Sequence, residues 1–143
     1  MNKFGYILFA ALATFSLASI AENSTDCLRD GDNVSLEGKV WRETFPGRPN
    51  YESIEDGDEP ETVWILTLDS PRCVLGVSVE DNSLFEIGQL FRFQLVLTPS
   101  QYKQHLATLE HRAEIKGQLF QAVSGHHHTK ALIDVKKVKA VSP

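Results

Sequence analysis

Thr62–Leu68 (TVWILTL) is the most informative segment for the fold, because it is apolar at both alternating sets of positions. Successive side chains of a strand point to opposite sides, so a strand that is apolar on both sides belongs in the middle of a sheet. The sequence predicts a central strand here. Asp69-Ser70-Pro71 then predicts a turn, and alternating residues over 73–79 predict a returning strand.

Half-buried strands are predicted on both sides of this central one. Apolar and polar residues alternate over 34–40, and two further strands are predicted over 113–122 and 131–138. The strand over 90–97 is expected to bury one face and expose Arg92 and Gln94 on the other. The buried face would carry Phe91, Phe93, Leu95 and Leu97.

A single short helix is predicted after the strand at 90–97. Thr98-Pro99-Ser100-Gln101 has the pattern of a helix start, with Thr as N-cap, Pro at the first position and Gln three residues after the cap. Tyr102, Leu106 and Leu109 follow at spacings of four and three residues, which places them on one stripe.

This order of elements predicts a mainly β fold, a small OB-like barrel of five to six strands with one short helix. Gly38 and Gly117 lie inside predicted strands, where a glycine permits the sharp bends of a small barrel. A β-sandwich or meander is the alternative. In an OB barrel the loop between strands one and two and the loop between strands four and five lie at the same binding face.

Composition and charge fit one folded domain. The chain has 143 residues, of which 42% are apolar, and a net charge of −5. A disordered chain would be less apolar, and a protein that binds nucleic acid would present a basic face. We therefore expect a single domain over residues 22–143 and no nucleic-acid partner.

Residues 1–21 have the pattern of a cleavable signal peptide. Lys3 supplies a positive start, residues 6–17 form an apolar core, and Ser19-Ile20-Ala21 offers the small residues of a cleavage site. An uncleaved membrane anchor is the alternative, but residues 4–20 are short for a span and include Thr14, Ser16 and Ser19. No later apolar run reaches spanning length. The prediction is a periplasmic or secreted protein without a membrane span after cleavage.

The two cysteines, Cys27 and Cys73, both follow this segment. In an oxidising compartment a disulfide between them is the expected state, and it would pin the N-terminal segment onto the sheet. The alternative is a redox-active or metal-binding thiol, which the isolated positions of the two cysteines do not favour.

Residues 43–61 (ETFPGRPNYESIEDGDEPE) form a predicted loop that is strongly acidic. It holds seven of the nineteen acidic residues and one cation, Arg48. A solvated surface loop is one interpretation. The alternative is half of a ligand site, for which Arg48, Tyr51 and Glu52 are the candidate contacts.

Three consecutive histidines lie in the loop between the last two predicted strands, within 124–129 (SGHHHT). In an extended backbone His126 and His128 share one face, and His127 faces the other way. Two imidazoles so placed, with a carboxylate from 43–61, could bind Zn²⁺ or Cu²⁺. His127 is a candidate for ligand binding. The alternatives are hydrogen bonding that locks the turn and proton exchange with a ligand.

Several of these segments also resemble a known family. FPGRPNYES (45–53), GDEPE (57–61), GQLF (117–120) and GHHHT (125–129) are similar to a bacterial exported family known as domain of unknown function 4431. The resemblance extends over most of the chain after the leader and implies a small secreted domain. It implies no activity, cofactor or catalytic residue.

The function predicted from the sequence is that of an exported binding or interaction module. Its site would lie where the 43–61 loop and the His126–His128 loop meet, and its partner would be a small ligand or another envelope protein. A divalent metal-binding protein that uses His126 and His128 is the alternative. A hydrolase is the weakest of the three, because the sequence has no nucleophile elbow, HExxH or phosphate-binding glycine loop.

Overall fold

The computed structural model describes residues 26–142. The predicted signal peptide over 1–21 lies outside these residues. The described part is mainly β with one short α-helix, as the sequence predicted. Its elements are β1 (Leu28–Arg29), β2 (Asn33–Pro46), β3 (Pro60–Val77), β4 (Leu84–Val96), α1 (Pro99–Gln104), the 3₁₀ turn η1 (Leu106–Thr108), β5 (Arg112–Gln121) and β6 (Ala131–Ala140).

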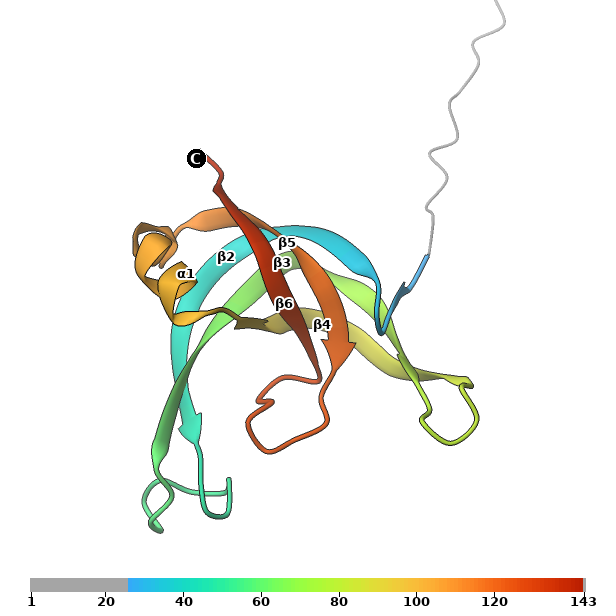
Figure 1. The fold of residues 1–143 in the computed structure, drawn as a ribbon, viewed down its shortest axis with the longest axis horizontal. Coiled ribbons are helices and arrows are strands. Elements are labelled where there is room, and N and C mark those ends of the chain that lie inside the picture. Colours follow the sequence, from blue (N-terminus) through green and yellow to red (C-terminus); the bar gives the residue numbers. More distant parts are fainter. Residues whose placement is uncertain (1–25, 143) are drawn as a thin grey trace, which may run out of the picture.

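The six strands form one sheet whose pairings close into a ring. The strand order is β1-β3-β2-β5-β6-β4, and β4 also pairs with β3. Figure 1 shows the long strands β2, β3 and β4 curving around one another, with α1 at one end. The pairs β1–β3 and β4–β6 are parallel and the other pairs are antiparallel. The two long loops, between β2 and β3 and between β5 and β6, project from the same side of the molecule in Figure 1.

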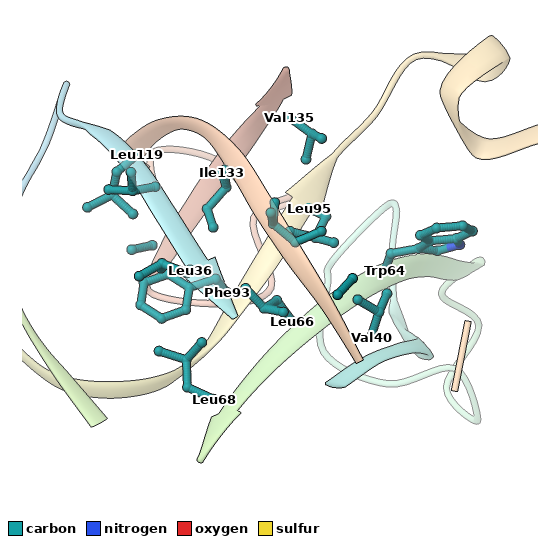
Figure 2. Close-up of a cluster of buried hydrophobic side chains, with 14 of the residues drawn as sticks. Leu36, Val40, Trp64, Leu66, Leu68, Phe93, Leu95, Leu119, Ile133 and Val135 are labelled. Atoms are coloured by element: carbon teal, nitrogen blue, oxygen red, sulfur yellow. The ribbon is translucent and has the colours of Figure 1, made fainter. Parts of the chain in front are cut away.

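The main core lies inside this ring. Trp64, Leu66 and Leu68 of β3 point into it, and side chains of the other long strands meet them (Figure 2). Many of these side chains are fully buried, so the core carries most of the apolar burial that stabilises the fold. The other core residues are Val34, Leu36, Val40, Val74, Phe93, Leu95, Leu97, Ala113, Ile115, Leu119, Ala131, Ile133 and Val135.

The opposite face of β3 is buried as well. Val63 and Ile65 are 6% and 0% exposed, although neither belongs to the main core. Ile65 pairs with Gln94 of β4, and Gln94 pairs with Leu132 of β6, so the three side chains share a face. Residues 122–130, between β5 and β6, are bonded to this face through Gln94. The predicted central strand is therefore confirmed, and a loop is attached on the side of its second face.

The turn predicted at Asp69-Ser70-Pro71 is wrong. β3 continues through these residues to Val77 and keeps the same antiparallel partner, β4. The register shifts between Thr67 and Arg72, where several residues of β3 lie opposite the single residue Phe91. The extra residues are absorbed as a bulge, which bends a strand without reversing it.

The same irregularity explains a second error. Phe91 was predicted to be buried, but it is 47% exposed, because it lies opposite the bulge. Phe93, Leu95 and Leu97 are buried as predicted, while Gln94, predicted to be exposed, is buried on the other face of β4.

The predicted helix start is confirmed. The Thr98 hydroxyl accepts a hydrogen bond from Gln101 N, and the Gln101 side chain accepts one from Thr98 N. Gln101 Nε2 also donates to Val135 O of β6 at 3.0 Å, which ties the helix to the sheet. Tyr102 and Leu109 pack against the core as predicted, whereas Leu106 is exposed.

Glycines inside two strands permit close approach of neighbouring backbones. A Cβ atom added to Gly38 would lie 2.2 Å from Thr67 O, and one added to Gly117 would lie 2.3 Å from Asp134 O. These are the two glycines at which the sequence predicted bends, and the structure shows close backbone approach at both. Any larger side chain there would push strands of the ring apart.

Cys27 and Cys73 are joined in a disulfide, as predicted. Next to the bond, Leu28 of β1 pairs with Val74 of β3. The bond thus holds the first described residues against the edge of β3.

We expect a Cys27→Ser/Cys73→Ser variant to have a free energy of unfolding lower by about 4 kcal/mol, because the disulfide restricts the unfolded chain over a sequence separation of 46 residues. Urea unfolding followed by tryptophan fluorescence measures the difference. The reduced wild-type protein should match the variant. Equal unfolding free energies for the oxidised protein and the variant would contradict the prediction.

Candidate functional site

The predicted acidic loop is shorter in the structure than in the sequence interpretation. Residues 43–46 belong to β2 and residues 60–61 to β3, and Pro46 pairs with Pro60. The loop between them, residues 47–59, is called the acidic loop from here on. Its ends are tied together, since Gly47 N donates to Glu59 O and Glu59 N donates to Arg48 O, both at 2.7 Å.

A single carboxylate organises the interior of the acidic loop. Asp58 is buried and accepts hydrogen bonds from the backbone N–H groups of Asn50, Glu52 and Ser53 at 2.7–2.9 Å. These donors stabilise the charged form, and the strongest effect, from Glu52 N, holds the pKa of Asp58 below its usual value. The acidic loop is therefore a closed, internally bonded structure and not a flexible spacer.

The His loop, residues 122–130, is anchored by Gln94 and Thr129. The Gln94 side chain donates to His126 O at 3.0 Å and accepts from His128 N at 2.7 Å. The Thr129 hydroxyl accepts from Gln94 N and donates to Ala131 O. A side chain from the neighbouring strand thus replaces the strand pairing that the loop lacks.

The two loops meet at Glu61, the second residue of β3. Its carboxylate lies 2.9 Å from His126 Nδ1 and 3.1 Å from His128 Nε2. The Tyr51 hydroxyl lies 3.0 Å from His126 Nε2. A carboxylate can only accept, so Nδ1 of His126 carries the proton and Nε2 of a neutral ring accepts from Tyr51. The result is a continuous series of hydrogen bonds from Tyr51 through His126 to Glu61.

Aromatic contacts fix the rings in this arrangement. His128 is stacked on Phe45 with ring centroids 4.5 Å apart, and its side chain is 7% exposed. The Tyr51 ring meets His126 edge-on and covers Gly125, where an added Cβ would lie 2.7 Å from the ring. Tyr51 itself has φ 60°, a left-handed conformation that only the surrounding contacts hold in place.

His127 faces away from Glu61, as the alternation predicted. Its Nδ1 accepts from Val123 N at 2.9 Å, and its ring meets Phe120 edge-on. Partial burial lowers the pKa of His127, and the neighbouring His126 and His128 lower it further. His127 therefore stabilises the turn instead of lining the surface shared with the acidic loop.

The surface between the two loops contains a hollow of about 210 Å³. His126 is the exposed histidine here, with 43% of its side chain accessible. The hollow offers a guanidinium, two carboxylates and an imidazole to a ligand. Its lining residues are Gly47, Arg48, Glu59, Pro60, Glu61 and His126.

The structure places the predicted site residues unequally. Arg48 and His126 line the hollow, and Tyr51 holds His126 from the acidic loop. His128 is nearly buried behind them. Glu52 contributes its backbone N–H to Asp58 while its side chain is exposed.

Sequence reasoning missed the residues that assemble the site. Glu61 was one of several acids in the predicted loop, and nothing in its position singled it out. Gln94 interrupts an apolar strand, which was a usable signal, because a polar residue between buried neighbours needs a partner. Phe45 and Thr129 carried no such signal.

Two comparisons with known proteins bear on this site. Residues 92–139 match the model of a family described as Domain of unknown function (DUF4431), which confirms the resemblance. The match includes Gln94 and the His loop. It stops short of the acidic loop and Glu61, so it covers less of the chain than the resemblance suggested. No curated protein matches the chain.

We expect an Asp58→Asn variant to be less stable than the wild type at pH 7. Because the pKa of folded Asp58 is lowered, its stabilising effect is present above the usual pKa of about 4 and is lost as the pH falls through the lower, folded value. The two unfolding free energies should therefore converge below about pH 4.

Urea unfolding between pH 7 and pH 2 tests this, with Asp56→Asn as the control. Asp56 is an exposed acid of the same loop. A difference between wild type and Asp58→Asn that stays constant over this range would contradict the explanation.

Proposed function

We propose that the protein is an exported, periplasmic or secreted binding module that holds a small polar ligand, or a polar group of another envelope protein, in the hollow between the acidic loop and the His loop. The leader-like pattern of residues 1–21 supports export. The observation that carries the binding proposal is the contact of Tyr51 and Glu61 with His126, because it builds one polar surface from two distant loops.

The closed ring of strand pairings supports an OB-like barrel as the finer description of the fold. The ring order β3-β2-β5-β6-β4, with α1 before the last two strands, agrees with that topology. In this description the acidic loop follows the first long strand and the His loop precedes the last. OB barrels bind ligands beside this pair of loops.

The chemistry of the hollow favours a ligand with both an anionic group and hydrogen-bond donors. Arg48 is exposed, and within residues 26–142 its guanidinium is in no ion pair despite the many acids around it. A guanidinium binds a carboxylate or phosphate in a bidentate manner. Glu59 would accept hydrogen bonds from hydroxyl or ammonium groups of the same ligand.

NMR titration of the ¹⁵N-labelled domain over residues 22–143 tests this proposal. The probes are amino acids, dipeptides, hexoses and uronic acids. We expect a binding compound to shift the amides of residues 47, 48, 59, 61 and 126, and the affinity to fall at least about tenfold, or 1.4 kcal/mol, in Arg48→Ala. Arg29→Ala, an exposed arginine on β1, is the matched control. The proposal fails if no probe binds, or if Arg48→Ala binds like the wild type.

Divalent metal binding is the second candidate. His126 Nδ1 and His128 Nε2 lie 3.0 and 3.1 Å from the same oxygen of Glu61, so three donors surround a small volume. However, within residues 26–142 no three His, Cys, Asp or Glu side chains have the geometry of a metal site in the present arrangement. A metal would have to displace the hydrogen bonds to Glu61, and we therefore rank this candidate second.

Calorimetry with Zn²⁺ and Cu²⁺ separates the two candidates. If the protein binds metal here, His126→Ala/His128→Ala should lose the affinity, and wild-type binding should weaken below about pH 6 as the imidazoles become protonated. His105→Ala/His111→Ala removes two other histidines and is the control. Equal, weak binding by all three proteins excludes the metal candidate.

No helix within residues 26–142 has the length and apolar character needed to span a membrane. We propose no reaction for the site. The hydroxyl group that bonds to His126 is the phenol of Tyr51. This bond joins the acidic loop to the His loop, and this structural role accounts for its position.

A further inference from the structure

We propose that the open edge of β4, between Leu84 and Arg92, receives an extended peptide segment of a partner protein as an additional strand. An apolar side chain of that segment would fill a hollow beside the edge. The residues that line this second hollow are different from those that line the hollow next to His126.

The edge is open because β4 is much longer than its pairing with β6. β4 pairs with β3 from Leu84 to Leu95, but with β6 only over Gln94–Val96. In a strand, alternate backbone groups point to opposite neighbours, so part of those in 84–91 point away from β3. The register with β3 shifts at Ile87, so the alternation runs separately over 84–86 and 88–90. Within the described residues no strand pairs with them on that side. Such an edge is a template for strand addition.

A second hollow, of about 310 Å³, lies directly beside this edge. Phe85 and Ile87 form its wall on β4, and Gln121, Ala122 and Lys130 form the opposite side. Phe85 is 46% exposed, and Val123, next to Ala122 in the chain, is 73% exposed. In peptide recognition by strand addition, backbone bonds supply affinity and a pocket for an alternate side chain supplies specificity. The edge of β4 offers the backbone groups, and the hollow offers the pocket.

The hollow is held in shape by specific contacts. The Gln121 side chain accepts from Val77 N at 3.0 Å and donates to Val77 O at 3.2 Å, so it links β5 to the end of β3. Gly76 allows this approach, since a Cβ there would lie 2.4 Å from Phe85 Cζ and 2.5 Å from Gln121 Oε1. The Phe85 ring and the Gln121 amide therefore rest against the backbone of β3.

The lining also indicates the chemistry of the occupant. Lys130 is the charged residue among the lining residues, so a peptide with an acidic group near its apolar residue fits best. A second copy of the chain fits less well. Its edge would offer Phe85 and Ile87, which already form the wall of the hollow and so cannot also fill the hollow of a partner copy.

Selection from a display library of random twelve-residue peptides, on the immobilised disulfide-bonded domain, supplies the probes. We expect enriched peptides to share an apolar residue with an acid nearby. As synthetic peptides, they should protect amides of 84–91 from hydrogen exchange. Phe85→Ser and Lys130→Glu should each weaken binding at least tenfold in fluorescence anisotropy. Val79→Ser, on the same hairpin, 92% exposed and outside the lining, should bind like the wild type.

Three results would overturn the proposal: no enrichment over a blank support, selected peptides that leave amides 84–91 unprotected, or a peptide-free dimer that protects the same amides. Phe85 and Lys130 are both exposed, so neither substitution removes a core side chain. If one variant fails to fold, the binding affinity of the other still tests the proposal. Arg48→Ala should bind the peptides normally. Failure of this proposal and failure of the ligand proposal are therefore distinguishable.

Discussion

The constraint on which the site depends is that β3 must be covered on both faces. Trp64 and Leu66 face the interior of the ring, and Val63 and Ile65 face outward. If Val63 and Ile65 were exposed to water, they would form an apolar patch in the middle of the sheet. The hydrophobic effect disfavours such an exposed patch. Gln94 shares this face with Ile65 and is bonded to the His loop, which therefore lies on the same side of the sheet.

Polar contacts attach the His loop to the sheet. A loop on an apolar surface leaves backbone groups without strand partners, and each would be costly if buried. The Gln94 side chain supplies part of what is missing, and Glu61 binds the two rings that project from the loop. Consequently the three adjacent histidines differ in what they do. His127 and His128 stabilise the loop, and His126 is the one that lines the polar hollow.

The two proposed binding surfaces result from the same feature of the topology. The chain leaves the sheet after β5 to form the His loop, and it rejoins β4 only at Gln94. On one side of the His loop, its contact with the acidic loop forms the polar hollow. On the other side the first part of β4 pairs with β3 alone, and its other edge borders the apolar hollow. One long loop therefore creates two surfaces of opposite character.

The elements that depend on local patterns could be predicted from the amino-acid sequence. The alternation in TVWILTL, the capping box at Thr98 and the order of strands around one helix were enough to predict a β fold. That order also led to the expectation that the two loops meet. These features depend on residues close in the sequence, whose period and hydrogen bonds can be read directly.

Which residues make the site, and where strands bend, depends on contacts between distant parts of the chain. Asp69-Ser70-Pro71 has turn chemistry, yet continued pairing with β4 makes it a bulge. Glu61 is one acid among seven until the ring of strands places it between two imidazoles. Such outcomes depend on partners far away in the chain, and a local pattern contains no information about the distance to those partners.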